Sequence, residues 1–129
     1  MKFFSSFSFF VSLIAITYST IIAFVPHIEG HNIYIQNKLD RGTWASVAAT
    51  LIQEDNFDWE NNDAFAQDSS RSHAGFVLTV PDNVKSYWII LGVGLSLEED
   101  KWRGPFNNTQ DICWHFHGHF ENWEIWSCF

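Results

Sequence analysis

Three histidines at alternate positions dominate the C-terminal end of the chain. His115, His117 and His119 lie in a segment that also holds both cysteines, Cys113 and Cys128. Side chains alternate between the two faces of a β-strand, so on a strand these three imidazoles and Cys113 share one face. Imidazole is a preferred ligand of zinc, copper, nickel and iron. The spacing therefore predicts a metal-binding strand, with zinc or copper as the candidate ion.

A disulfide between Cys113 and Cys128 would make this segment a hairpin, because disulfide-bonded residues must lie close together. We expect a four-residue loop, His119 to Asn122, since Phe120-Glu121 lacks the Gly, Asn or Asp that two-residue turns favour. In this register three further pairs face one another: His115 with Trp126, His117 with Glu124, and His119 with Asn122. The candidate metal ligands are His115, His117, His119 and Glu124.

The opposite face of the hairpin is largely apolar. Trp114, Phe116 and Phe120 alternate with the histidines, and Trp123 and Ile125 accompany them on the second strand. We expect this face to pack against another sheet. The histidines also fit a simpler interpretation, in which they are ordinary half-exposed polar residues on the solvent side of an edge hairpin.

The N-terminal residues read as a targeting segment rather than as part of the fold. Within residues 1–23, Lys2 is followed by Phe-rich apolar sequence, which is typical of a secretory signal. An uncleaved membrane anchor over residues 3–25 is the alternative. We expect residues 24–129 to form a single extracellular β domain, because disulfides persist in oxidising compartments.

The charge balance narrows the classes of partner. The 129 residues include 15 Asp and Glu against 7 Lys and Arg, a formal net charge of −8. Phosphate-rich surfaces bind clustered basic residues, so we expect neither nucleic acid nor an anionic membrane as a partner. An extracellular protein or a glycan fits better.

Apolar alternation predicts six or so short strands and no regular helix, although a short helix is an alternative for the second segment. This pattern predicts an all-β fold, a small antiparallel β-sandwich or barrel with one disulfide. Two polar stretches, 54–73 and 98–110, read as long connections. The expected strands cover residues 31–39, 43–53, 75–81, 86–97 and the two arms of the 113–128 hairpin.

Tryptophan is unusually abundant, with seven in the chain. We expect Trp59, Trp102 and Trp126 to lie in loops or on the polar face, where an indole ring can stack on a sugar or anchor a protein interface. Asn107 begins the sequon Asn107-Asn108-Thr109 and is the predicted glycosylation site.

Catalytic patterns are weak in this sequence. It contains no Gly-x-Ser-x-Gly nucleophile elbow, and its acids are scattered along the chain. The sequence therefore favours a secreted, non-enzymatic binding or interaction module for a carbohydrate or protein ligand. A metal-binding protein that uses the histidine hairpin and a membrane-active toxin that uses exposed aromatics are the two alternatives.

Overall fold

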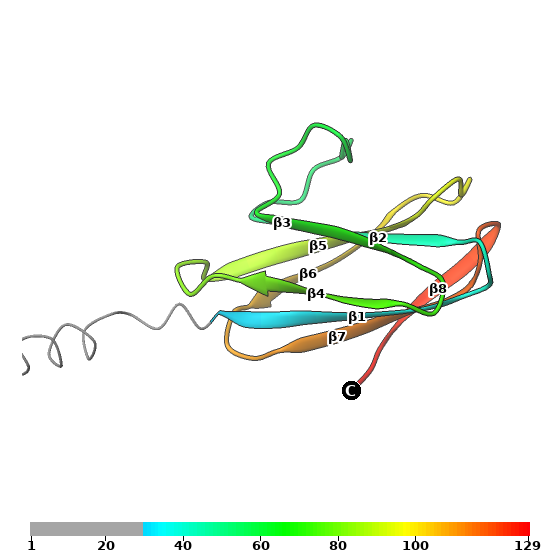
Figure 1. The fold of residues 1–129 in the computed structure, drawn as a ribbon. Coiled ribbons are helices and arrows are strands. Elements are labelled where there is room, and N and C mark those ends of the chain that lie inside the picture. Colours follow the sequence, from blue (N-terminus) through cyan, green and yellow to red (C-terminus); the bar gives the residue numbers. More distant parts are fainter. Residues whose placement is uncertain (1–29) are drawn as a thin grey trace, which may run out of the picture.

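Eight strands form two four-stranded sheets that pack face to face in a computed structural model, which describes residues 30–129 (Figure 1). The first sheet has the strand order β4-β1-β7-β8, and the second has the order β3-β2-β5-β6. The predicted β-sandwich is confirmed. The strands are β1 His31–Leu39, β2 Trp44–Thr50, β3 Ala66–Arg71, β4 Gly75–Val80, β5 Ser86–Val93, β6 Lys101–Asn107, β7 Ile112–His119 and β8 Asn122–Ser127.

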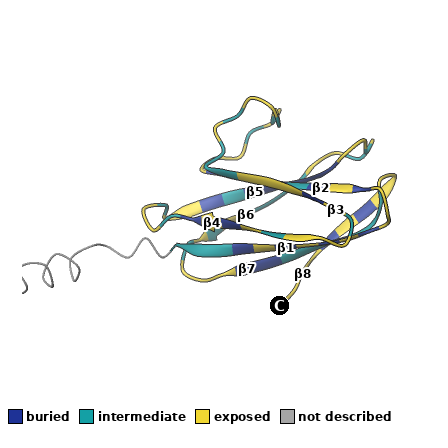
Figure 2. Cartoon of the chain, viewed as in Figure 1, coloured by how far each residue is buried: buried dark blue, intermediate teal, exposed yellow. Residues whose placement is uncertain are grey.

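The core lies between the two sheets and is built by alternation. In β1 the apolar side chains of Ile33, Ile35 and Leu39 are buried. Tyr34, Gln36 and Lys38 point to solvent. β4 and β8 show a similar alternation, whereas β2 and β5 in the centre of the second sheet are buried at most consecutive positions (Figure 2). The inward residues of the other strands complete this core, among them Val47, Leu78, Val80, Tyr87, Ile89, Leu91, Phe116, Trp123 and Ile125.

One strand pair is parallel. β1 pairs with β4 in the antiparallel sense but with β7 in the parallel sense. Parallel neighbours need a long connection, and all four strands of the second sheet lie between β1 and β7 in the sequence. The pairing sets Gln36 beside His115 and Lys38 beside His117, so the histidine strand is central in its sheet.

Two strands lie inside the stretches that the sequence assigned to connections. Residues 54–73 contain β3, and residues 98–110 contain β6, so the expectation of uninterrupted loops was wrong there. β3 is almost wholly polar, and only Ser70 in it is buried. β6 contains Gly104-Pro105, a combination that argues against a central strand but is tolerated at a sheet edge.

A loop covers the outer face of the second sheet. Ala48 and Ile90 point away from the main core, yet both are buried. Residues 51–65 stand above this sheet in Figure 1, and Phe57 of this loop packs against Trp102 of β6. A Cβ atom on Gly92 would lie 2.9 Å from the indole of Trp59, so that ring rests directly on the sheet backbone.

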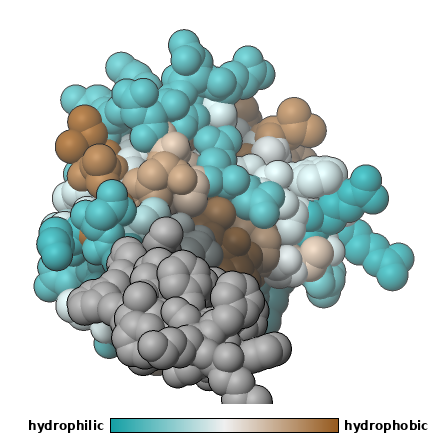
Figure 3. Space-filling view, turned by 60° about the vertical axis from the view of Figure 1, so that its left-hand side comes forward, coloured by the Kyte–Doolittle hydropathy of each residue, from teal (hydrophilic) through white to brown (hydrophobic). Residues whose placement is uncertain are grey.

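The predicted signal segment, residues 1–23, lies outside the described residues. Within residues 30–129, no helix is long and apolar enough to cross a membrane. Viewed from the end of the sandwich where β1 begins, the surface is mainly hydrophilic, and hydrophobic side chains form separate patches (Figure 3).

Candidate functional site

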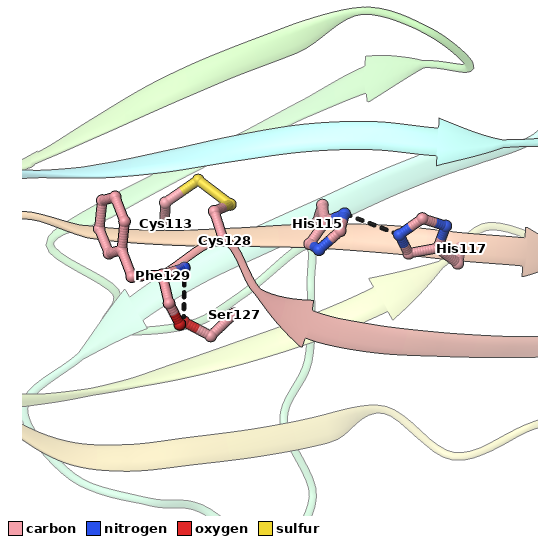
Figure 4. The surroundings of a disulfide bond; sticks show 6 residues. All are labelled: Cys113, His115, His117, Ser127, Cys128 and Phe129. Atoms are coloured by element: carbon pink, nitrogen blue, oxygen red, sulfur yellow. Dashed lines mark hydrogen bonds between the residues drawn. A yellow bond between two sulfur atoms is a disulfide. The ribbon is translucent and has the colours of Figure 1, made fainter.

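The C-terminal hairpin forms with the predicted register. Cys113 and Cys128 are disulfide-bonded, with their Cα atoms 5.2 Å apart (Figure 4). Across β7 and β8, His115 faces Trp126, His117 faces Glu124, and His119 faces Asn122. Most of the predicted apolar face is confirmed, because Phe116, Trp123 and Ile125 are buried and Trp114 packs against the core. Phe120 was wrongly assigned to this face, since it lies in the turn and is 46% exposed.

The hairpin turn is shorter than expected. Strand pairing continues to His119 and Asn122, which leaves the two-residue turn Phe120-Glu121 instead of a four-residue loop. The unusual backbone conformation falls at Gly118, whose φ is +102°. Only glycine adopts that conformation freely, and a side chain there would meet the backbone carbonyl of Asn122. Gly118 therefore lets the strands close without Gly or Asn in the turn.

His115 and His117 contact each other directly. The Nε2 atom of His117 lies 2.7 Å from the Nδ1 atom of His115, and the ring centroids are 4.3 Å apart (Figure 4). One of these nitrogens carries the shared proton and the other accepts it. Trp126 packs against both rings, with centroid distances of 4.4 Å to His117 and 5.9 Å to His115. The three side chains form one aromatic cluster on the outer face of the first sheet.

The environment of His115 favours the neutral imidazole. Burial lowers the pKa of His115 below its usual value, and the neighbouring His117 and Lys38 lower the pKa further. A hydrogen bond with the backbone of Ser127 acts in the opposite direction. The net direction is downward, so His115 loses its proton more easily than a free histidine.

The other two predicted metal ligands are not part of this cluster. His119 accepts a hydrogen bond from the backbone N–H of Glu121 at 3.2 Å, and its ring lies against Phe120. Glu124 is exposed on β8 opposite His117. In the described part of the chain, no three His, Cys, Asp or Glu side chains gather as a metal site. The structure thus brings two of the four candidates together.

Outward-facing side chains of β1 extend the cluster across the sheet. Gln36 lies beside His115, and Lys38 lies beside His117. Both are exposed, as is Tyr34, which is paired with Cys113. Alternation within 31–39 correctly puts these residues on the solvent side, but nothing in the sequence indicated that this strand lies next to the histidines.

A shallow hollow of about 290 Å³ adjoins these outward-facing side chains of β1. Its lining includes Gln36 and Lys38 from β1, together with His73 from the turn between β3 and β4. His73 has a positive φ of 67°, and its ring nitrogen Nδ1 lies 2.6 Å from the Ser72 hydroxyl. The outer face of the first sheet therefore offers aromatic rings, hydrogen-bonding groups and a recess side by side.

Two of the three candidate ligand-binding tryptophans lie elsewhere. Trp59 donates a hydrogen bond from Nε1 to Asp100 at 2.8 Å, and Phe57 packs edge-on against both Trp59 and Trp102. These rings cover the outer face of the second sheet and are half-buried. Trp126 is the member of the predicted set with a large free surface, since 52% of it is exposed.

The predicted glycosylation site is at the end of β6. Asn107 is exposed there, whereas the next residue, Asn108, donates hydrogen bonds to the carbonyls of Pro81 and Val84. Asn108 also contacts the ring of His31 through its side-chain oxygen, at 3.0 Å. The side-chain amide of Asn107, the predicted point of glycan attachment, is thus on the surface. Asn108 holds the local backbone through its hydrogen bonds.

No protein-family model matches the chain, and no curated protein matches it. Among solved structures, the listeriolysin O crystal structure matches with a TM-score of 0.44 and 14% identity, covering 75% of this chain and 22% of that one. The membrane pore complex of pneumolysin gives a TM-score of 0.43 at 9% identity, covering 77% of this chain and 23% of that one. This chain spans less than a quarter of these proteins, and at these TM-scores the likeness bears on no functional property.

Proposed function

We propose that this protein is a secreted, non-enzymatic binding module that holds a neutral glycan on the outer face of the first sheet. The observation that carries the proposal is the exposed indole of Trp126, which stands in register with hydrogen-bonding side chains on the neighbouring strands. The C–H face of a sugar ring stacks on an exposed indole, and its hydroxyls need polar partners nearby.

Strand register supplies those polar partners in two rows. Trp126, His115 and Gln36 form one row across β8, β7 and β1. Glu124 and Lys38 flank His117 in the next row. These groups include both donors and acceptors, which is what sugar hydroxyls require. The chain's net charge of −8 disfavours acidic glycans, so the ligand class is neutral.

The size of the face favours a short oligosaccharide over a monosaccharide. Four strands separated by about 4.8 Å give a width of about 14 Å from β8 to β4. The hollow lined by Gln36 and Lys38 lies at β1, two strands away from Trp126 on β8. A ligand stacked on the indole at one end would reach the recess at the other end.

A glycan array probed with tag-free protein tests the proposal. We expect binding to neutral oligosaccharides and a loss of more than tenfold in affinity for Trp126→Ala, equivalent to about 1.4 kcal/mol. Trp44→Ala is the matched control, because Trp44 is similarly exposed, at 46%, but belongs to the second sheet. Absence of any array signal, or an equal loss in both variants, would contradict the proposal.

A membrane-active role is the second candidate, and a different surface favours it. Leu95 and Leu97, on the loop between β5 and β6, are 96% and 98% exposed. Leakage of dye from neutral phosphatidylcholine vesicles tests this alternative. Leakage that disappears in the double variant Leu95→Ser, Leu97→Ser but persists in Trp126→Ala would support it over the glycan proposal.

A further inference from the structure

The contact between His115 and His117 has a geometry that suits a bound ion as well as a shared proton. We propose that the Nδ1 atom of His115 and the Nε2 atom of His117 together bind one divalent transition-metal ion, either copper or zinc. The proposal rests on the 2.7 Å approach of these two nitrogens and not on the proposed glycan binding, although both histidines lie on the face assigned to that function.

The distance between the two nitrogens is close to what a chelate needs. Bond lengths of about 2.0–2.1 Å from zinc to nitrogen, at a tetrahedral angle, separate two ligating nitrogens by about 3.4 Å. The rings must therefore open by only about 0.7 Å for an ion to replace the shared proton. Both side chains are half-buried at the surface, and small rotations about their side-chain torsions provide that movement.

The backbone fixes the pair before any ion arrives. Residues two apart on one strand point to the same face about 7 Å apart at Cα, which lets the two rings converge. β7 is held on one side by β1 and on the other by β8, which the Cys113–Cys128 disulfide ties in place. Little ordering of the backbone is then needed when the ion binds.

The charged residues that flank the pair are of opposite sign, and Lys38 opposes a positive charge on His115. Lys38 lies beside His117 on one neighbouring strand, and Glu124 lies opposite it on the other. His119 is engaged with the backbone of Glu121. With two protein nitrogens, the remaining coordination positions are taken by water, so affinity is lower than at a site with three protein ligands. Copper should bind more tightly than zinc.

Calorimetric titration of tag-free protein with CuCl₂ and with ZnCl₂ tests the proposal. We expect one ion per chain and a drop in affinity of at least tenfold for His117→Ala. His119→Ala is the matched control, since it removes a histidine from the same strand outside the pair, and its affinity should stay within twofold of wild type. No saturable binding, or an equal loss in the two variants, would overturn the proposal.

Ring-nitrogen NMR spectra identify the ligating atoms without relying on a variant that folds poorly. On adding ZnCl₂, the Nδ1 signal of His115 and the Nε2 signal of His117 should shift together, whereas the ring nitrogens of His119 and His73 should not. Shifts confined to His119 or His73 would overturn the assignment. These spectra are recorded without any glycan, so the result of the metal test does not depend on the result of the glycan test.

Discussion

Both sheets carry tryptophan on their outer faces, but the ring is packed under a loop on the second sheet and exposed on the first. On the second sheet, residues 51–65 fold back and place Trp59 directly over Gly92, where its N–H is bonded to Asp100. On the first sheet, Trp126 lies against two histidines and keeps half of its surface free. An indole with a satisfied N–H and a covered ring stabilises the fold, whereas an uncovered ring is available for a ligand.

The two faces also differ in what holds them together. The loop over the second sheet is held in shape by the packing of Phe57 against Trp59. Asn62 also donates hydrogen bonds to the backbone carbonyls of Asp58 and Trp59. The hairpin that carries the histidines is closed by the Cys113–Cys128 disulfide. A covalent link thus ties the edge strand β8, which carries Trp126, to its neighbour β7.

The largest expected effect comes from removing that link. The double variant Cys113→Ala, Cys128→Ala should lower the free energy of unfolding by about 3 kcal/mol, because the disulfide closes a loop with a sequence separation of 15 residues. Urea denaturation followed by fluorescence measures it. A loss below 1 kcal/mol would mean that packing of Phe116 and Trp123 alone holds the hairpin.

Tryptophan truncation on each face sharpens the comparison. Trp59→Ala should lower the free energy of unfolding by about 2 kcal/mol, since a half-buried ring that packs over Gly92 and its hydrogen bond to Asp100 are lost. Trp126→Ala should change it by no more than about 0.5 kcal/mol. Thermal and urea denaturation of both variants give these values. Equal losses would show that Trp126, on the outer face of the first sheet, stabilises the fold as much as Trp59 does on the second sheet.

The smallest expected effect concerns His115 and pH. Its lowered pKa means that the folded state favours the neutral ring. Above about pH 6.5 this contribution is fully present, because the ring is then neutral in both states. As pH falls from about 6.5 through the lower folded pKa, the unfolded chain takes up more protons and stability declines.

Urea denaturation between about pH 5 and 7.5 checks this prediction in metal-free protein. The stability of His115→Gln should fall less steeply with acidification than that of wild type. An identical slope for the two proteins would mean that the surroundings of His115, including His117 and Lys38, do not shift its titration.

The parts of the fold that were predictable from sequence are those with strong local constraints. A single possible disulfide set the hairpin register, and alternation in 31–39 predicted the strand and its buried apolar residues, although not the buried Asn37. β3 was missed because its sequence, Ala-Gln-Asp-Ser-Ser-Arg, has no apolar alternation and is held by backbone pairing with β2. β6 was missed because Gly104-Pro105 reads as a turn.

The candidate site was predictable only in part, because it joins residues from distant segments. The alternation of His115 and His117 was visible in sequence, but their approach to 2.7 Å and the loss of His119 from the group depend on ring orientation. Gln36 and Lys38 reach the site through the parallel pairing of β1 with β7, a contact across about 80 residues that leaves no local signature. The structural role of Trp59 likewise follows from a loop that folds onto its own sheet.

The most direct test of the open face as the binding surface follows the indole N–H signals of all seven tryptophans by NMR. The neutral oligosaccharide with the strongest array signal is titrated into isotope-labelled protein. We expect the Trp126 signal to shift and saturate while those of Trp59 and Trp102 stay in place. Saturable shifts of Trp59 or Trp102 with an unmoved Trp126 would contradict it.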